Sequence, residues 1–132
     1  MGLNSPYHGK SKSQFSNVLI VLFIIGGLSS YSTVLLLVAY MNEYNLKMNA
    51  ALTPSRLLMG FLDYYSYYFK VSMYGIDVSD GGSFYKHTSP ESLFVILDPL
   101  NQQNNTTKNS FLTHEIIKSF RKAFNSLKNL LL

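Results

Sequence analysis

The side chains that could carry chemistry are few and scattered. The chain has three histidines, His8, His87 and His114, which lie far apart in the sequence, and it has no cysteine. Metal sites and activated nucleophiles need such side chains at short spacings. We therefore expect the histidines to be surface residues. The lack of cysteine excludes a disulfide scaffold, a thiolate-ligated zinc site and a cysteine nucleophile, and it fits an intracellular protein.

Two further patterns are better explained by local structure than by catalysis. Asp77 and Asp80 stand beside the run Asp80-Gly81-Gly82, a strong turn signal, and we interpret both as residues that cap this turn. The run Asn104-Asn105-Thr106-Thr107 contains two overlapping glycosylation acceptors, which we interpret as accidental because no signal peptide is evident. Spacing alone therefore identifies no active site.

The composition is that of one modest globular domain. Hydrophobic residues make up 47% of the 132 residues and charged residues 14%, against roughly 25% charged in a typical soluble domain. This balance excludes an intrinsically disordered chain. The net charge is +4, and residues 101–132 carry five Lys and Arg against one Glu. A basic C-terminal end permits a polyanionic partner, although a solvated helix face explains it equally well.

The N-terminal part admits two interpretations. Residues 1–17 are polar and predict a mobile arm, whereas residues 18–40 contain no charge and are long enough to span a bilayer. A membrane span needs one unbroken helix, but Gly26 and Gly27 interrupt the run and the serines after them can cap a new helix. We therefore favour a buried helix from about Ser30 to Asn45, within a single domain at 18–132.

The rest of the chain predicts two more helices and a short β element. Thr53-Pro54 is typical of a helix start, and apolar residues at helical spacing continue to Phe69. A predicted buried strand at 93–97 ends at Asp98-Pro99, and a polar loop at 101–110 leads to a last helix from about Thr113 to Asn129. The expected fold class is mainly α with a small β element (α+β), with about four helices and a two- or three-stranded sheet.

Three motifs in order carry a resemblance to a known family. They are Gly26-Gly27-Leu28-Ser29-Ser30-Tyr31-Ser32, then Asp80-Gly81-Gly82-Ser83-Phe84, then a run from Asp98-Pro99-Leu100-Asn101 through Asn104-Asn105-Thr106-Thr107-Lys108 to Phe111. Together they resemble the PAP-associated domain of TRAMP-type atypical poly(A) RNA polymerases, in the nucleotidyltransferase superfamily. The resemblance covers residues 23–128 and implies the helical half of a two-domain enzyme.

The resemblance also implies roles for particular residues. Tyr31 would offer a ring on which a nucleotide base stacks, and Ser30 would bond a phosphate oxygen beside the helix start. Asn104 would read the base edge, Asn105 would do the same or hold the loop, and Lys108 would reach phosphate or pin the loop. Asp98 would anchor the loop rather than touch substrate. The structural motif comprises Gly26, Gly27, Asp80, Gly81, Gly82, Asp98 and Pro99.

The nucleotide implied by the resemblance is an adenine nucleotide, held weakly. Related uridylyl-adding enzymes often place a histidine in the last loop, and none occurs between Asp98 and Phe111. Adenine is therefore expected over uracil. The implied location is the nucleus.

The metal-binding part of the resembled enzymes has no counterpart in this sequence. Those enzymes transfer nucleotides with two Mg²⁺ ions held by a Gly-Ser motif, an Asp-x-Asp pair and a third carboxylate in a separate N-terminal domain. Asp77-Val78-Ser79-Asp80 has the wrong spacing and no Gly-Ser partner. ATP and Mg²⁺ are expected for the intact enzyme, and no cofactor or metal for this chain alone. Either the reading frame is part of a longer gene, or the protein is a divergent remnant.

The expected function is that of a partial poly(A) RNA polymerase-like protein, active in RNA 3′-end adenylation and RNA processing. This chain would contribute the base-binding half, be inactive alone, and pair with the missing catalytic domain or another subunit. The alternatives are a small membrane-anchored protein with its span at 18–40, and a non-catalytic domain that docks RNA or protein through Lys118, Arg121 and Lys122. The favoured hypothesis requires Tyr31 and the two asparagines to converge on a single pocket.

Overall fold

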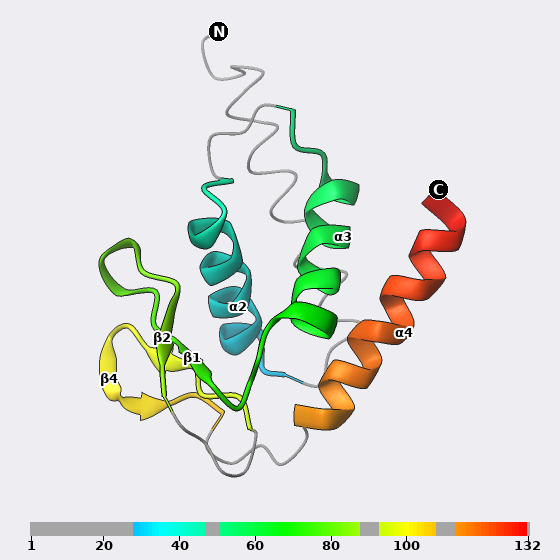
Figure 1. Cartoon of the computed structure of the whole chain (residues 1–132). Coiled ribbons are helices and arrows are strands. Elements are labelled where there is room, and N and C mark those ends of the chain that lie inside the picture. The colour runs from blue at the N-terminus through cyan, green and yellow to red at the C-terminus, as the bar shows by residue number, and fades with distance from the viewer. Residues whose placement is uncertain (1–27, 47–50, 88–92, 108–112, 132) are drawn as a thin grey trace, which may run out of the picture.

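The computed structural model describes residues 28–46, 51–87, 93–107 and 113–131. Its α-helices are α2 (Ser30–Glu43), α3 (Pro54–Asp63) and α4 (Thr113–Leu131). Two antiparallel pairs accompany them: β1 (Tyr74–Ile76) with β2 (Phe84–Lys86), and β3 (Leu97–Asp98) with β4 (Asn101–Asn105). The α+β fold class is confirmed. In Figure 1 the two hairpins lie on one side of α2, and α4 lies on the far side of α3.

Helix α2 begins where the serine run predicts. Ser29 is its N-cap, with an extended ψ of 157°, and its side chain accepts a hydrogen bond from the backbone N–H of Ser32 at 3.2 Å. An N-cap serine satisfies a donor that has no partner within the helix. The unbroken helix from Val18 to Tyr40 that the membrane alternative requires is therefore wrong, because the chain is not helical at Ser29. Among the described helices, none combines the length and the apolar character needed to cross a bilayer.

Helix α3 starts as predicted but ends earlier. Thr53 caps it and Pro54 occupies its first turn. The prediction of a helix continuing to Phe69 is wrong in detail, because after Asp63 the chain widens into a π-helical turn, η2 (Tyr64–Tyr68). The backbone N–H of Phe69 donates to the carbonyl of Tyr64 at 2.8 Å, five residues back. This one-residue insertion changes which tyrosines face the core, and helical spacing cannot reveal it.

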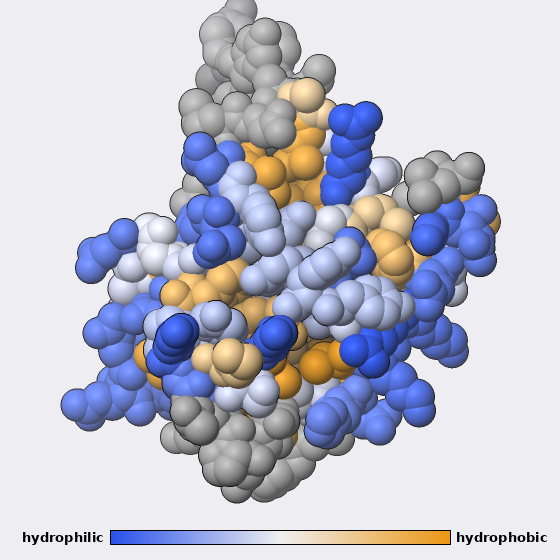
Figure 2. Space-filling view, viewed as in Figure 1, coloured by the Kyte–Doolittle hydropathy of each residue, from blue (hydrophilic) through white to orange (hydrophobic). Residues whose placement is uncertain are grey.

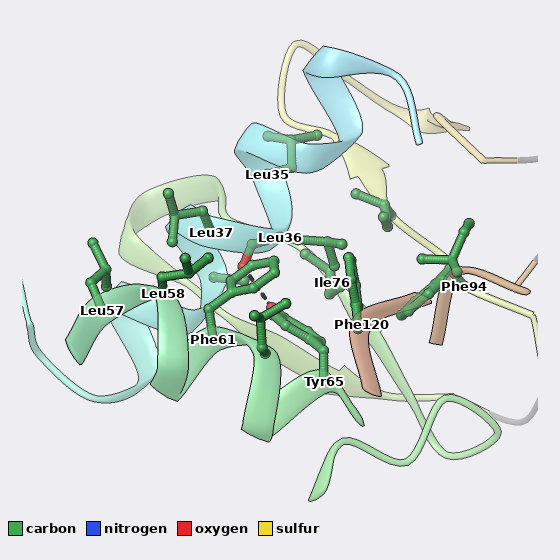
Figure 3. Packing of buried hydrophobic residues seen from close by; sticks show 14 residues of the cluster. Leu35, Leu36, Leu37, Leu57, Leu58, Phe61, Tyr65, Ile76, Phe94 and Phe120 are labelled. Atoms are coloured by element: carbon green, nitrogen blue, oxygen red, sulfur yellow. Dashed lines mark hydrogen bonds between the residues drawn. The ribbon is translucent and has the colours of Figure 1, made fainter. Parts of the chain in front are cut away.

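The core gathers around α2, as Figure 3 shows. Phe61 and Phe120 pack edge to face, with ring centroids 5.6 Å apart, and so join α3 to α4. The hydroxyl of Tyr65 donates to the carbonyl of Leu36 at 2.6 Å, and so joins η2 to α2 in the buried core. The buried apolar residues are Leu35, Leu36, Leu37, Ala39, Leu57, Leu58, Phe61, Leu62, Tyr65, Ile76, Phe94, Ile96, Ile116 and Phe120.

The β region differs from the prediction in two places. The expected strand at 93–97 is regular only at Leu97–Asp98, and before that Ile96 forms an isolated parallel bridge to Ile76. The side chains of Phe94 and Ile96 are nevertheless buried. The expected polar loop is wrong at 101–105, which form strand β4. Its first three residues are exposed, so no apolar alternation marked this strand in the sequence.

The predicted Asp-Gly-Gly turn is confirmed. Asp80 and Gly81 both have positive φ, 54° and 77°, and Gly81 adopts this backbone without strain because it has no Cβ. Asn42 donates through Nδ2 to the carbonyl of Gly82 at 2.8 Å, and the hydroxyl of Ser83 donates to the Glu43 carboxylate at 2.6 Å. The turn is therefore fastened to the C-terminal end of α2.

The buried bond of Tyr65 generates the first prediction. Tyr65→Phe removes the donor to the Leu36 carbonyl and keeps the ring, so the free energy of unfolding should fall by about 1 kcal/mol. Urea denaturation followed by circular dichroism measures it. The matched control is Tyr68→Phe, because Tyr68 is 66% exposed. The two variants losing equal stability would contradict a special role for the buried bond.

Candidate functional site

The start of α2 lies against the second hairpin. The hydroxyl of Tyr31 donates to Oδ1 of Asp98 at 2.6 Å, although the two residues are 67 positions apart. One residue along, the hydroxyls of Ser32 and Thr106 are 2.8 Å apart. The structure therefore brings together the two segments that the nucleotide hypothesis requires to be close.

Tyr31 combines an accessible ring with a fixed hydroxyl. Its side chain is 41% exposed, so part of the ring faces solvent. The hydrogen bond to Asp98 is the largest cause that raises the pKa of Tyr31, followed by partial desolvation and by the charge of Asp98. Because the phenol stays protonated and is held at its tip, the ring is positioned without being covered.

Asp98 is the polar centre of this region. Its Oδ1 also accepts from the backbone N–H of Leu100 at 2.9 Å, which closes the turn that contains Pro99. The bond from Tyr31 is the largest cause that lowers the pKa of Asp98, followed by the Leu100 bond, with a smaller contribution from the Asn104 side chain. Asp98 is therefore an ionised acceptor that ties α2 to the hairpin, which matches the anchoring role expected for it.

The two asparagines differ in what they contact. Oδ1 of Asn105 accepts from the backbone N–H of Ile96 and from that of Thr107, both at 3.0 Å. These bonds match the second of the two roles expected for Asn105, holding the loop. Asn104 is also half-buried, and its side chain is a minor cause that lowers the pKa of Asp98, so it lies near that carboxylate. Asn104 therefore belongs to the same polar group as Tyr31.

Ser30 lies exposed at the first position of α2. The first N–H groups of a helix have no acceptor within it, and they carry the positive end of the helix dipole. Here the side chain of Ser29 accepts a hydrogen bond from the backbone N–H of Ser32. The N–H groups of Ser30 and Tyr31 belong to this first turn, which lies against the hairpin. Lys108, Gly26 and Gly27 lie outside the described residues, as does the expected N-terminal arm.

A second polar bridge joins the two hairpins, and the sequence did not reveal it. Nε2 of Gln102 donates to the Asp77 carboxylate at 3.2 Å and to the hydroxyl of Ser79 at 2.9 Å. Asp77 also accepts from the backbone N–H of Ser79 at 3.0 Å, which is the predicted cap of the turn. Hydrogen bonding from the Ser79 side chain is the main cause that lowers the pKa of Asp77. A glutamine within a polar run carries no signal for such a role.

The described part of the chain brings no three His, Asp or Glu side chains together in a way that could hold a metal ion. His114 is exposed, as expected, whereas His87 is half-buried with its Nε2 covered. His8 lies outside the described residues. The polar group of Tyr31, Asp98 and Asn104 is therefore the candidate functional site.

Comparison with known proteins gives one family match. Residues 55–104 match the family model of the Cid1 family poly A polymerases, the PAP-associated domain. The matched segment runs from α3 into β4, so it contains the Asp-Gly-Gly turn, Asp98 and Asn104 but not Tyr31. It supports a relation to the poly(A) polymerase family. No curated protein and no solved structure matches the chain.

The Tyr31–Asp98 bond generates the second prediction. Tyr31→Phe removes the donor, so the pKa of Asp98 should rise toward its ordinary value of 3.8. The stabilisation that this carboxylate gives the native protein is fully present when the pH is above the ordinary pKa of the group. It is lost as the pH falls through the lower pKa of the native state. Carbon-13 NMR of the Asp98 carboxyl during an acid titration measures the shift. An unchanged pKa in the variant would show that the bond does not form in solution.

Proposed function

We propose that this chain contributes the base-binding half of a poly(A) RNA polymerase-like nucleotidyltransferase. The observation that carries the proposal is the bond from Tyr31 to Asp98, because it joins the exposed ring at the start of α2 to a residue of the family-matched segment. The ring of Tyr31 suits a base, the amide of Asn104 suits its polar edge, and the first N–H groups of α2 suit a phosphate.

The proposed binding mode assigns one role to each group. The base stacks on Tyr31, an interaction of roughly 1–3 kcal/mol. Asn104 offers its amide to the base edge, since an amide carries both donors and an acceptor. Ser30 and the first N–H groups of α2 receive the phosphates at the positive end of the helix dipole. Asn105 stabilises the hairpin through its bonds to the backbone. By the sequence resemblance, Lys108 contacts phosphate.

The wider setting of the proposal follows from the resemblance to TRAMP-type enzymes. The intact enzyme would be nuclear and would add adenylate to RNA 3′ ends during RNA processing. Two Mg²⁺ ions would supply activation of the attacking hydroxyl and neutralisation of the leaving pyrophosphate. The described residues do not fit such a metal pair, because they group no three potential ligands. In the proposed enzyme the residues of this chain bind and orient the nucleotide, and a separate catalytic domain or another subunit supplies the transfer chemistry.

The binding mode predicts a localised response to ATP. Titrating the full chain with ATP should shift the NMR signals of the Tyr31 ring and the Asn104 side-chain amide. Tyr31→Ala should weaken ATP binding at least about fivefold, because the stacking surface is lost. Tyr31→Phe should weaken ATP binding less than Tyr31→Ala does, because it keeps the ring and loses only the bond to Asp98 that positions it.

The control for ATP binding is Tyr44→Ala, which removes a half-exposed ring at the other end of α2. UTP in place of ATP tests the expected preference for adenine. ATP-induced shifts that spare both Tyr31 and Asn104 would place the nucleotide elsewhere and contradict the proposal.

The proposal also predicts that the chain alone has no polymerase activity. The purified chain, mixed with an RNA primer, ATP and Mg²⁺, should not extend the primer, because the three carboxylates for the metal pair have no counterpart in its sequence. Denaturing gel electrophoresis of a labelled primer measures extension. Primer extension by the purified chain alone would contradict the assignment as a half-site.

A further inference from the structure

A second surface with its own chemistry lies where η2 meets α4. We name it the aromatic–basic face: ring and cation contacts link Tyr67, Arg121, Phe124 and Lys128, and Tyr68, the next residue after Tyr67 in the chain, is counted with them. Tyr67 and Tyr68 come from the end of η2, and the other three come from one side of α4 at helical spacing. In Figure 2, hydrophilic side chains gather over α4.

The rings and cations of this face are interleaved. The Arg121 guanidinium lies 5.2 Å from the centre of the Tyr67 ring, and the Phe124 ring meets the Tyr67 ring edge to face at 5.9 Å. The Lys128 ammonium lies 6.0 Å from the centre of the Phe124 ring. Nε of Arg121 also donates to the carbonyl of Ser66 at 2.9 Å, which fixes the side chain across the junction. The face is therefore an ordered surface.

Two large rings remain open to solvent on it. Tyr67 is 49% exposed and Tyr68 is 66% exposed. Tyr68 makes no ring contact with any other residue that the structure describes. Adjacent exposed rings are favourable surfaces for a flat partner, because stacking on them removes apolar area from water.

The charge of the face is positive. Helix α4 carries four basic side chains and one acidic one, Glu115, which lies in the first turn and away from Lys128 at the other end. The acidic side chain of α4 is therefore remote from the Lys128 end of the face.

We propose that the aromatic–basic face binds single-stranded RNA, with bases stacked on Tyr68 and Tyr67 and phosphates held by Arg121 and Lys128. Stacking on exposed rings beside cations is the physical basis of sequence-tolerant single-strand binding. The choice of RNA among single strands rests on the family match to poly(A) polymerases, and the face itself is separate from the nucleotide site. Figure 1 shows α4 on the far side of α3 from the hairpins.

The test uses the full chain and a fluorescent single-stranded RNA of about 12 nucleotides, a length within the range of known single-strand sites. Fluorescence anisotropy gives the Kd. Tyr68→Ala should weaken binding roughly tenfold, because a stacking surface is lost. Tyr68→Phe should bind as the parent chain does. Circular dichroism of each variant shows that the fold is kept.

The charge is tested with a matched pair. Lys128→Glu should weaken RNA binding, whereas Lys86→Glu makes the same charge change at an exposed residue of β2 and should have a much smaller effect. Lys128→Ala should also lower the slope of log Kd against log salt by about 0.7, the value for one phosphate contact on a single strand.

Several outcomes would overturn the proposal. They are the absence of RNA binding, equal losses in the two Glu variants, tighter binding of duplex RNA or of single-stranded DNA of the same sequence, and self-association of the chain that Tyr68→Ala abolishes. If the parent chain binds ATP but binds no RNA, the result contradicts this face alone and leaves the nucleotide site unaffected. Retained RNA binding in Tyr31→Ala, with lost ATP binding, would confirm that the two sites are independent.

Discussion

The structure depends on burying α2 on nearly all its sides. Leu35, Leu36 and Leu37 are consecutive and all buried, and consecutive residues of a helix point in different directions. One neighbouring helix cannot cover three such directions. The helix α3 and the turn η2 therefore pack on one part of α2 and the β region covers another, and the bond from Tyr65 to the Leu36 carbonyl fixes this arrangement in the interior.

The two ends of α2 are held by different hairpins, and this explains why the candidate site forms where it does. Asn42 and Glu43 fasten the Asp-Gly-Gly turn near the C-terminal end of the helix. Tyr31 and Ser32 fasten the second hairpin at the N-terminal end. Gln102 joins the hairpins to each other. A polar frame around a buried apolar helix thus positions the ring of Tyr31 beside Asp98 and Asn104.

The π-helical turn serves the core and the surface at once. Its extra residue keeps Tyr65 and Ser66 buried while it presents Tyr67 and Tyr68 to solvent. Arg121 then reaches back from α4 to the carbonyl of Ser66 and covers one ring. The stability of the junction and the exposure of the aromatic–basic face therefore have the same structural origin.

The sequence by itself determined the helix starts at Ser29 and Thr53, the turn at Asp80-Gly81 and the α+β class, because caps, glycine turns and apolar periodicity are local signals. Only the tertiary structure decided the π-helical turn, the strand at 101–105 and the bonds made by Asp98, Asn105 and Gln102. Those features depend on partners distant in sequence, as Tyr31 is from Asp98, and a polar residue does not encode which distant partner it will meet.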